Sequence, residues 1–171
     1  MLELEIPETE LYDERTNEFI QVKKTVLRLE HSLVSVSKWE SKWRKPFLTK
    51  ESKTTEESID YIRCMTIGQK TVDPNVYLLI DAKIMKKITD YIEDEQTATT
   101  FTEHAGGRPN RQIVTSELIY FWMFQYGISI ECQKWHLSRL MTLIRIASIK
   151  NSPDKKMSKQ AILSQNRKLN A

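Results

Sequence analysis

The first apolar residues of the chain alternate with polar ones, which is the two-residue period of a half-buried β-strand. Over residues 2–6, leucine and isoleucine alternate with glutamate, and Pro7 ends the pattern. The polar stretch 8–18 predicts a loop. Residues 19–29 are rich in β-branched and aromatic side chains and predict a second strand, or two strands with a bend. We therefore expect a small N-terminal β-sheet of two to three strands within residues 1–30.

After this sheet the apolar spacing changes to three and four residues, the period of a helix. Ser32 can cap the first helix, because its hydroxyl can accept a hydrogen bond from a free backbone N–H. Pro46 ends the helix, because a proline ring cannot continue the hydrogen-bond ladder. Charged residues, Glu40 among them, occupy its polar side. The apolar side bears Leu33, Val36, Trp39 and Trp43.

Three further helix starts are marked by side chains that can cap an N-terminus. Thr54, followed three residues later by a glutamate, has the spacing of a capping box. Asp73, followed by a proline, is a second start, and the pattern after it fits one or two helices. Thr115 or Ser116 begins a strongly apolar helix that Gly127 can close in the left-handed conformation.

The longest helical pattern covers about residues 130–150 and is apolar on more than one side. One stripe includes Cys132 and Trp135, and another includes Met141 and Ile144. A helix that is apolar nearly all round lies in the interior of a protein. We therefore expect 130–150 to be one long central helix of the core.

Two segments lack these periods. Residues 93–114 are rich in threonine and contain a Gly-Gly-Arg-Pro-Asn-Arg run, which predicts a long exposed loop. Residues 151–171 follow a Ser-Pro break and predict a basic tail or a basic amphipathic helix. Strands first and helices afterwards indicate one mostly helical α+β domain over 1–150, with the sheet followed by a bundle of about five to six helices.

Composition supports a folded protein that is not exported. Of the 171 residues, 40% are apolar, and four Trp, five Phe and six Tyr are aromatic groups that a disordered chain rarely keeps in water. No apolar run approaches the roughly 20 residues that span a bilayer. The acidic N-terminus is unlike a secretory signal. Cys64 and Cys132 are too few for a disulfide framework and are interpreted as reduced core thiols.

The net charge of +3 hides two opposite blocks. Residues 1–18 hold seven carboxylates and one arginine, a net charge of −6, whereas residues 133–171 hold nine basic side chains and one aspartate, a net charge of +8. Such blocks can steer association within one protein or between copies, so a homo-oligomer is one possibility. They can equally be two solvated ends of the chain.

No catalytic, cofactor or metal motif stands out. His31, His104 and His136 neighbour no nucleophile in a known motif, and the sequence has no phosphate-binding loop or dinucleotide fingerprint. Cys132 and His136, four residues apart, could face one ion, but a structural zinc site needs two more ligands. A core thiol beside a hydrogen-bonded imidazole is the more ordinary interpretation. We expect no enzyme, no cofactor and no metal.

Binding is the remaining class of function, and nucleic acid is the less favoured kind of ligand. Arg108 and Arg111 in the glycine-rich run and the basic C-terminus could neutralise phosphates. The modest net charge and the acidic N-terminus favour instead a solvated loop and tail.

A protein is the favoured kind of ligand. Trp39 and Trp43, one helical turn apart, are of the kind that anchors interfaces, although aromatics anchor cores more often. In the C-terminal segment, Met157, Ile162 and Leu163 would need a cover and are better interface candidates.

Four stretches are distinctive when taken together: Ile6–Glu10, Lys38–Trp43 with Pro46 and Phe47, Ile59–Met65, and Glu131–Leu137 with Arg139 and Leu140. Over about residues 6–160, the chain resembles a virion-assembly protein of long-tailed bacteriophages, in the family of the tail assembly chaperones. These motifs are not catalytic signatures.

The resemblance implies a non-enzymatic protein in the cytoplasm of an infected or lysogenic bacterial host. Such a chaperone coats the long, apolar-rich tape-measure protein while tail-tube subunits polymerise around it, and then leaves. Many members are also made as a longer form by ribosomal frameshifting. The alternatives are a structural tail or head–tail component that stays in the virion, and a nucleic-acid-binding or regulatory phage protein.

Overall fold

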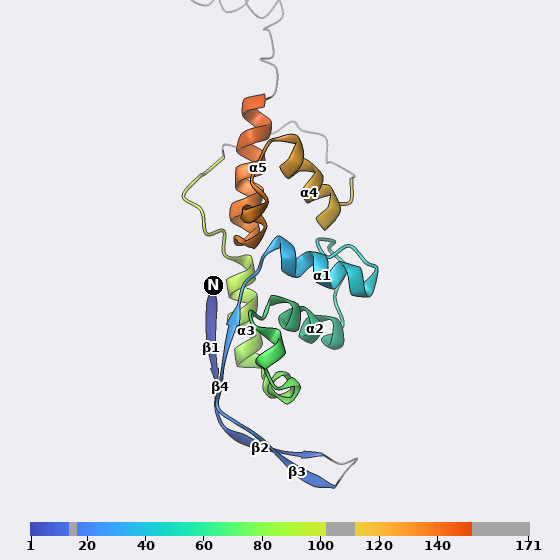
Figure 1. Ribbon diagram of the computed structural model, residues 1–171, viewed down its shortest axis with the longest axis vertical. Helices are drawn as coiled ribbons and strands as arrows, with labels where there is room; N and C mark the ends of the chain where they lie inside the picture. Colours follow the sequence, from blue (N-terminus) through green and yellow to red (C-terminus); the bar gives the residue numbers. More distant parts are fainter. Residues whose placement is uncertain (14–16, 102–111, 152–171) are drawn as a thin grey trace, which may run out of the picture.

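The strands of the chain precede its helices and extend the molecule at one end (Figure 1). The structure is a computed structural model that describes residues 1–13, 17–101 and 112–151. Within these ranges, four short strands are followed by five α-helices and three 3₁₀ helices. The predicted α+β class with a dominant helical part is confirmed, although the strands outnumber the two to three expected.

The strands form two consecutive antiparallel pairs along one hairpin. β1 (Leu2–Ile6) pairs with β4 (Thr25–Leu29), and β2 (Thr9–Asp13) pairs with β3 (Glu18–Val22). The alternation in β1 and β4 turns one face of that pair inward, as the period of a half-buried strand requires. The buried residues of this face are Leu4, Ile6, Leu27 and Leu29.

The second pair corrects the predicted loop over residues 8–18. Residues 9–13 form β2, in which Leu11 lies opposite Ile20 and Tyr12 lies opposite Phe19. β2 and β3 extend beyond the helices (Figure 1), so apart from the buried Val22 and the half-buried Leu11 they have little core to face, and their sequence lacks a clean alternation. Cross-strand pairing, more than burial, defines these strands.

The first two helices begin at the predicted caps. α1 (Leu33–Trp43) starts after Ser32, whose side chain accepts a hydrogen bond from the backbone of Ser35. α2 (Thr55–Met65) starts at Thr54 with a complete capping box. α1 ends before Pro46, as expected, and its C-cap, Arg44, is in the left-handed region with φ 56°.

The next stretch contains the second predicted start. η1 (Gln69–Thr71) is followed by η2 (Pro74–Leu79), which Asp73 caps, and then by α3 (Ala82–Glu93), which Asp81 caps. The alternative of two helices after Asp73 is therefore the one observed. α3 packs against β1 (Figure 1).

α4 (Ser116–Gln125) follows the poorly periodic segment. Thr115 caps it, and Gly127 follows it with φ 65°, the left-handed conformation that the sequence predicts. Residues 94–101 and 112–115 have no regular secondary structure, in agreement with the predicted loop. The residues between these two segments lie outside the described part of the chain.

The predicted single helix over 130–150 is wrong, because the chain breaks before its middle. η3 (Ile130–Lys134) and α5 (Leu137–Asn151) are separated by Trp135, which is extended, and His136. Two contacts with a segment distant in the sequence hold this break. The backbone N–H of Leu137, the first residue of α5, donates to the carbonyl oxygen of His31 at 2.7 Å, and His136 forms an isolated β-bridge with Ser32, just before α1. These contacts join segments about a hundred residues apart, so local spacing does not reveal them.

The centre of the core is α1 rather than α5. α1 packs against α2, α4 and η3, and Trp39 on its inner side is only 2% exposed. α5 buries one narrow side fully and a flanking side partly, and exposes a third side that bears Arg139, Arg145 and Ile149, so it is amphipathic rather than central. Its buried residues are Leu137, Leu140 and Ile144.

Candidate protein interface

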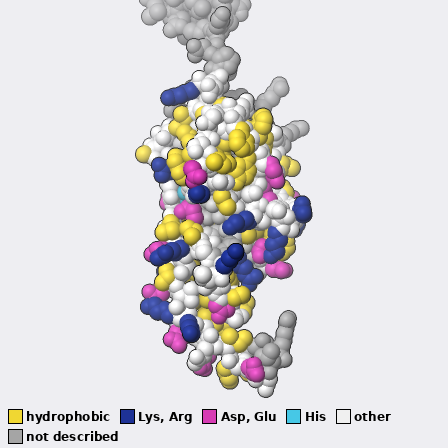
Figure 2. All heavy atoms as spheres, in the orientation of Figure 1, with side chains coloured by type: hydrophobic (Ala, Val, Ile, Leu, Met, Phe, Trp, Pro, Cys, Tyr) yellow, Lys and Arg dark blue, Asp and Glu magenta, His cyan; other side chains and the backbone are white. Residues whose placement is uncertain are grey.

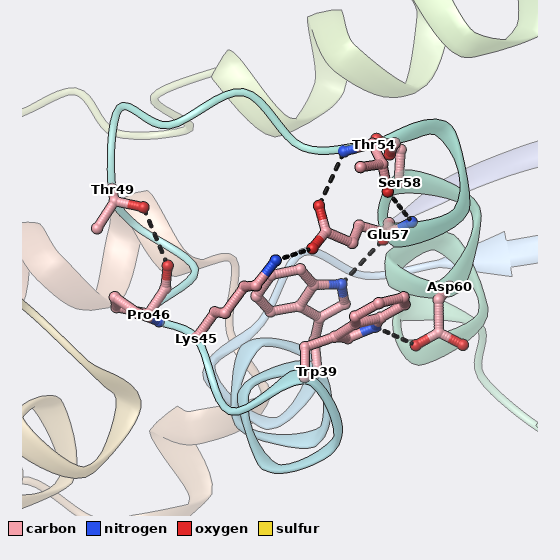
Figure 3. Close-up of polar contacts among 9 residues, drawn as sticks. Trp39, Lys45, Pro46, Thr49, Thr54, Glu57, Ser58 and Asp60 are labelled. Atoms are coloured by element: carbon pink, nitrogen blue, oxygen red, sulfur yellow. Dashed lines mark hydrogen bonds and ion pairs between the residues drawn. The ribbon is translucent and has the colours of Figure 1, made fainter.

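Trp39 and Trp43, the two tryptophans named as candidate partner contacts, join α1 to α2. The indole N–H of Trp39 donates to the backbone oxygen of Glu57 at 2.9 Å, and the indole N–H of Trp43 donates to Asp60 at 2.9 Å (Figure 3). Their rings stack at 6.1 Å between centroids. Trp39 is buried, so it cannot present a surface to a partner, and that part of the interface hypothesis is wrong. Trp43 is half-buried and retains a small exposed edge.

Charged side chains form hydrogen bonds and ion pairs at the edge of the α1–α2 pair. The Glu57 carboxylate accepts hydrogen bonds from Lys45 at 2.6 Å and from the backbone of Thr54 at 2.8 Å (Figure 3). These two contacts, the lysine first, lower the pKa of Glu57. Lys42 forms a matching ion pair with Asp60. The polar groups between α1 and α2 therefore already have hydrogen-bond or ion-pair partners within the chain.

A buried carboxylate positions α4, and the sequence did not indicate it. Glu40 was assigned to the polar side of α1, yet it is buried and its two oxygens accept backbone hydrogen bonds, both at 2.7 Å, from Phe47 and Ser116. Ser116 is the first residue of α4, where free N–H groups favour a negative charge. Glu40 therefore fixes the start of α4 on α1.

Two buried histidines meet where α1, α2, α3 and α5 converge. Nδ1 of His31 lies 2.5 Å from the hydroxyl of Tyr61, and the rings of His31 and His136 are 5.1 Å apart. Burial, and secondarily the nearby His136, lowers the pKa of His31 to about 3. Burial also lowers the pKa of His136, whose Nε2 lies 3.1 Å from the carbonyl oxygen of Tyr91. Both rings are part of the packed interior.

The outer side of α4 is the clearest unpartnered apolar surface of the described residues. Its inner side, with Ile119 and Met123, is buried, whereas Phe121 and Phe124 are 59% and 70% exposed. Figure 2 shows hydrophobic side chains gathered over the end of the molecule where α4 and α5 lie. Other exposed large apolar residues of this end are Ile113, Ile130, Trp135 and Ile149. We call Phe121 and Phe124 the α4 outer face.

An open cavity lies along another side of the same helix. It has a volume of about 940 Å³ and is lined by α4, α5 and the segment 95–101. Trp122, Tyr126 and Met141 supply apolar walls. The Arg145 guanidinium lies 4.0 Å from the ring centre of Phe101, at the same cavity.

The remaining predicted contacts are not placed by the structure. Arg108, Arg111, Met157, Ile162 and Leu163 lie outside the described residues. The α4 outer face was missed because the sequence shows an apolar helix without showing which of its sides is covered. The low amphipathicity of residues 118–124 was the available signal.

The cysteines and charged groups form no cluster suited to a metal ion within the described ranges. Cys132 is buried in η3 and Cys64 is half-buried in α2, and both are free thiols. Burial raises the pKa of Cys64. Cys132 lies in η3, whereas His136 lies between η3 and α5, so the helical spacing that suggested a shared ion is not present.

Comparisons by sequence and by fold returned no match: no family model, no curated protein and no solved structure is similar to this chain. Among the described helices, none is both long and apolar enough to cross a membrane.

Proposed function

We propose that this protein is a non-enzymatic tail assembly chaperone that binds the tape-measure protein through the α4 outer face. The observation that carries the binding role is the exposure of Phe121 and Phe124 on a helix whose opposite side is fixed in the core. The identity of the partner comes from the resemblance to phage tail assembly chaperones.

The chemistry of the surface suits an apolar helical partner. Two phenylalanines one turn apart form a ridge, and covering such rings removes a large apolar area from water. The Glu40 contacts to the first turn of α4 hold this ridge in place, so little ordering is needed before binding. An apolar-rich segment of a tape-measure protein, laid along the ridge, would be shielded from aggregation.

Co-expression with the tape-measure protein encoded beside this chain tests the proposal. We expect the wild-type chain to keep the tape-measure protein in the soluble fraction and the Phe121→Ser/Phe124→Ser variant to lose most of this effect. The matched control is Ile67→Ser/Leu78→Ser, which removes two comparably exposed apolar side chains away from α4. The control should act like the wild type.

Equal insolubility of the tape-measure protein with and without this chain would contradict the proposal. Equal loss in both double variants would remove the role of the α4 outer face. Mass spectrometry of purified virions separates the chaperone from a structural tail component: a chaperone leaves, so its peptides should be absent.

A further inference from the structure

The start of α5 is tied to the segment before α1 by contacts of two histidines. The backbone N–H of Leu137 donates to the carbonyl oxygen of His31 at 2.7 Å, and His136 forms a β-bridge with Ser32. The side chains of the same two histidines pack against each other, with ring centres 5.1 Å apart, and each residue is only 4% exposed. The two imidazoles therefore lie inside the connection that their own backbones make.

The ring of His136 is held in a form that does not accommodate a second proton. Its Nε2 lies 3.1 Å from the carbonyl oxygen of Tyr91, which can only accept, so Nε2 carries the hydrogen and donates it. Nδ1 is then the unprotonated nitrogen, and it is buried without a hydrogen-bond partner among the described residues. A proton added at Nδ1 would create a buried positive charge and an N–H group without an acceptor. The closed arrangement therefore favours the neutral ring.

The ring of His31 packs against uncharged rings, those of Phe47, Tyr61 and His136. Burial, with a smaller contribution from His136, lowers the pKa of His31 to about 3. Tyr61 on α2 and Tyr91 on α3 are neutral phenols, because burial raises the pKa of both hydroxyls. Two charged imidazoles in contact would also repel each other.

Two carboxylates act on His136 and determine which ring is protonated first. Glu30, which follows β4, accepts a hydrogen bond from the Tyr91 hydroxyl at 2.7 Å and pairs with the Met1 amino group at 3.1 Å. Burial lowers the pKa of His136, whereas the hydrogen bond to Tyr91 and the charges of Glu30 and Asp94 oppose this effect. The Met1 amino group acts in the same direction as burial. We therefore expect His136 to take up the first proton, at Nδ1.

α5 is held by fewer contacts than the helices beside it. Its buried side consists of Leu137, Leu140 and Ile144. By comparison, α1 and α2 are joined by two indole hydrogen bonds and two ion pairs, and Glu40 fixes α4 to α1. These contacts involve no histidine, so they persist when the histidine contacts break.

We propose that acid opens the contact between the start of α5 and the segment before α1, as a local step in which His136 and His31 take up protons. In the open form α1, α2 and α4 stay packed, whereas the buried side of α5 reaches water. Both histidines then titrate near pH 6.5, so each can increase the opening equilibrium by up to about tenfold per pH unit below that value. The inference is independent of the proposed function, because it involves neither Phe121 nor Phe124.

Amide hydrogen exchange of the full chain, followed by NMR at pH 7 and pH 5, tests the inference. Each rate is expressed as a protection factor, so the intrinsic effect of pH cancels. The reporter is the Leu137 amide, whose acceptor is the carbonyl oxygen of His31. Its protection should fall by about tenfold or more between pH 7 and pH 5. At pH 5 it should stay well below that of the amides inside α1 and α2, and low concentrations of urea should hardly change it, because a local opening exposes little surface.

The variant His31→Gln/His136→Gln removes both titrating groups, and its amides can still form hydrogen bonds. In this variant the protection of the Leu137 amide should be nearly the same at both pH values. His104→Gln removes the third histidine of the chain and is the matched control, which should respond like the wild type. Circular dichroism at pH 7 shows whether each variant is folded. If the double variant is not, His136→Gln alone replaces it and should show a weaker response than the wild type.

Three results would overturn the inference. The first is equal protection of the Leu137 amide at pH 7 and pH 5 in the wild type. The second is exchange of this amide at the same rate and with the same urea dependence as the amides inside α1 and α2, because the opening would then be global unfolding. The third is a full response to pH in the folded glutamine variant.

Discussion

At the scale of single residues, the aromatic side chains show where pattern reasoning ends. Trp39 and Trp43 have the spacing of one helix side, and the sequence identifies that side as apolar. Whether such a side meets the protein's own core or a partner depends on α2, which lies later in the chain. The structure decides this through two indole hydrogen bonds to residues of α2, one of them to the backbone of Glu57.

The His31 environment predicts an acid-sensitive fold. In the unfolded chain a histidine titrates near pH 6.5, whereas burial lowers the pKa of His31 to about 3 in the fold. The unfolded state therefore binds more protons between these values. The contribution of His31 to the free energy of unfolding is fully present above about pH 6.5. It decreases as the pH falls toward 3, by up to about 1.4 kcal/mol per pH unit.

Urea denaturation at pH 7 and pH 5 measures the effect. The free energy of unfolding of the wild type should be lower at pH 5. A His31→Gln variant, which cannot titrate at this position, should show a smaller difference between the two pH values, with His136 supplying part of what remains. An equal difference in both proteins would show that His31 is not the group responsible.

At the scale of elements, the starts of helices were the most predictable feature. Ser32, Thr54, Asp73 and Thr115 all cap helices, because a cap depends on side chains within three residues of it. β2 and the break at Trp135 were not predicted. β2 depends on pairing with β3, and the break depends on a backbone hydrogen bond to His31, so both need the rest of the fold.

The link between α1 and α4 predicts a large effect of one buried carboxylate. Glu40→Ala would leave the N–H groups of Phe47 and Ser116 without their acceptor in the interior. Unsatisfied buried donors and the lost charge-assisted bonds should lower the free energy of unfolding by about 3 kcal/mol. Glu51→Ala, at an exposed glutamate of the following loop, is the control and should change it by less than about 0.5 kcal/mol.

Chemical denaturation of the two variants checks this prediction. Glu40→Gln should fall between the wild type and Glu40→Ala, because the amide oxygen can still accept one of the two hydrogen bonds. If Glu40→Ala were as stable as Glu51→Ala, the carboxylate would have no role in fixing α4.

At the scale of the whole molecule, the core and the surfaces were unequally predictable. The fold class follows from the order of strand and helix periods along the chain. The α4 outer face does not, because residues 118–124 are apolar on all sides and only the packed structure shows that one side meets α1. The predicted contacts at Arg108, Arg111, Met157, Ile162 and Leu163 remain predictions.

Hydroxyl-radical footprinting of the complex with the tape-measure protein tests the central claim most directly, because it measures the exposure of individual side chains. Labelling of Phe121 and Phe124 should fall on binding toward the level of the buried Met123, while Ile67 and Leu78 should keep their labelling. Unchanged labelling of both phenylalanines in a stable complex would contradict the claim that the α4 outer face binds the partner.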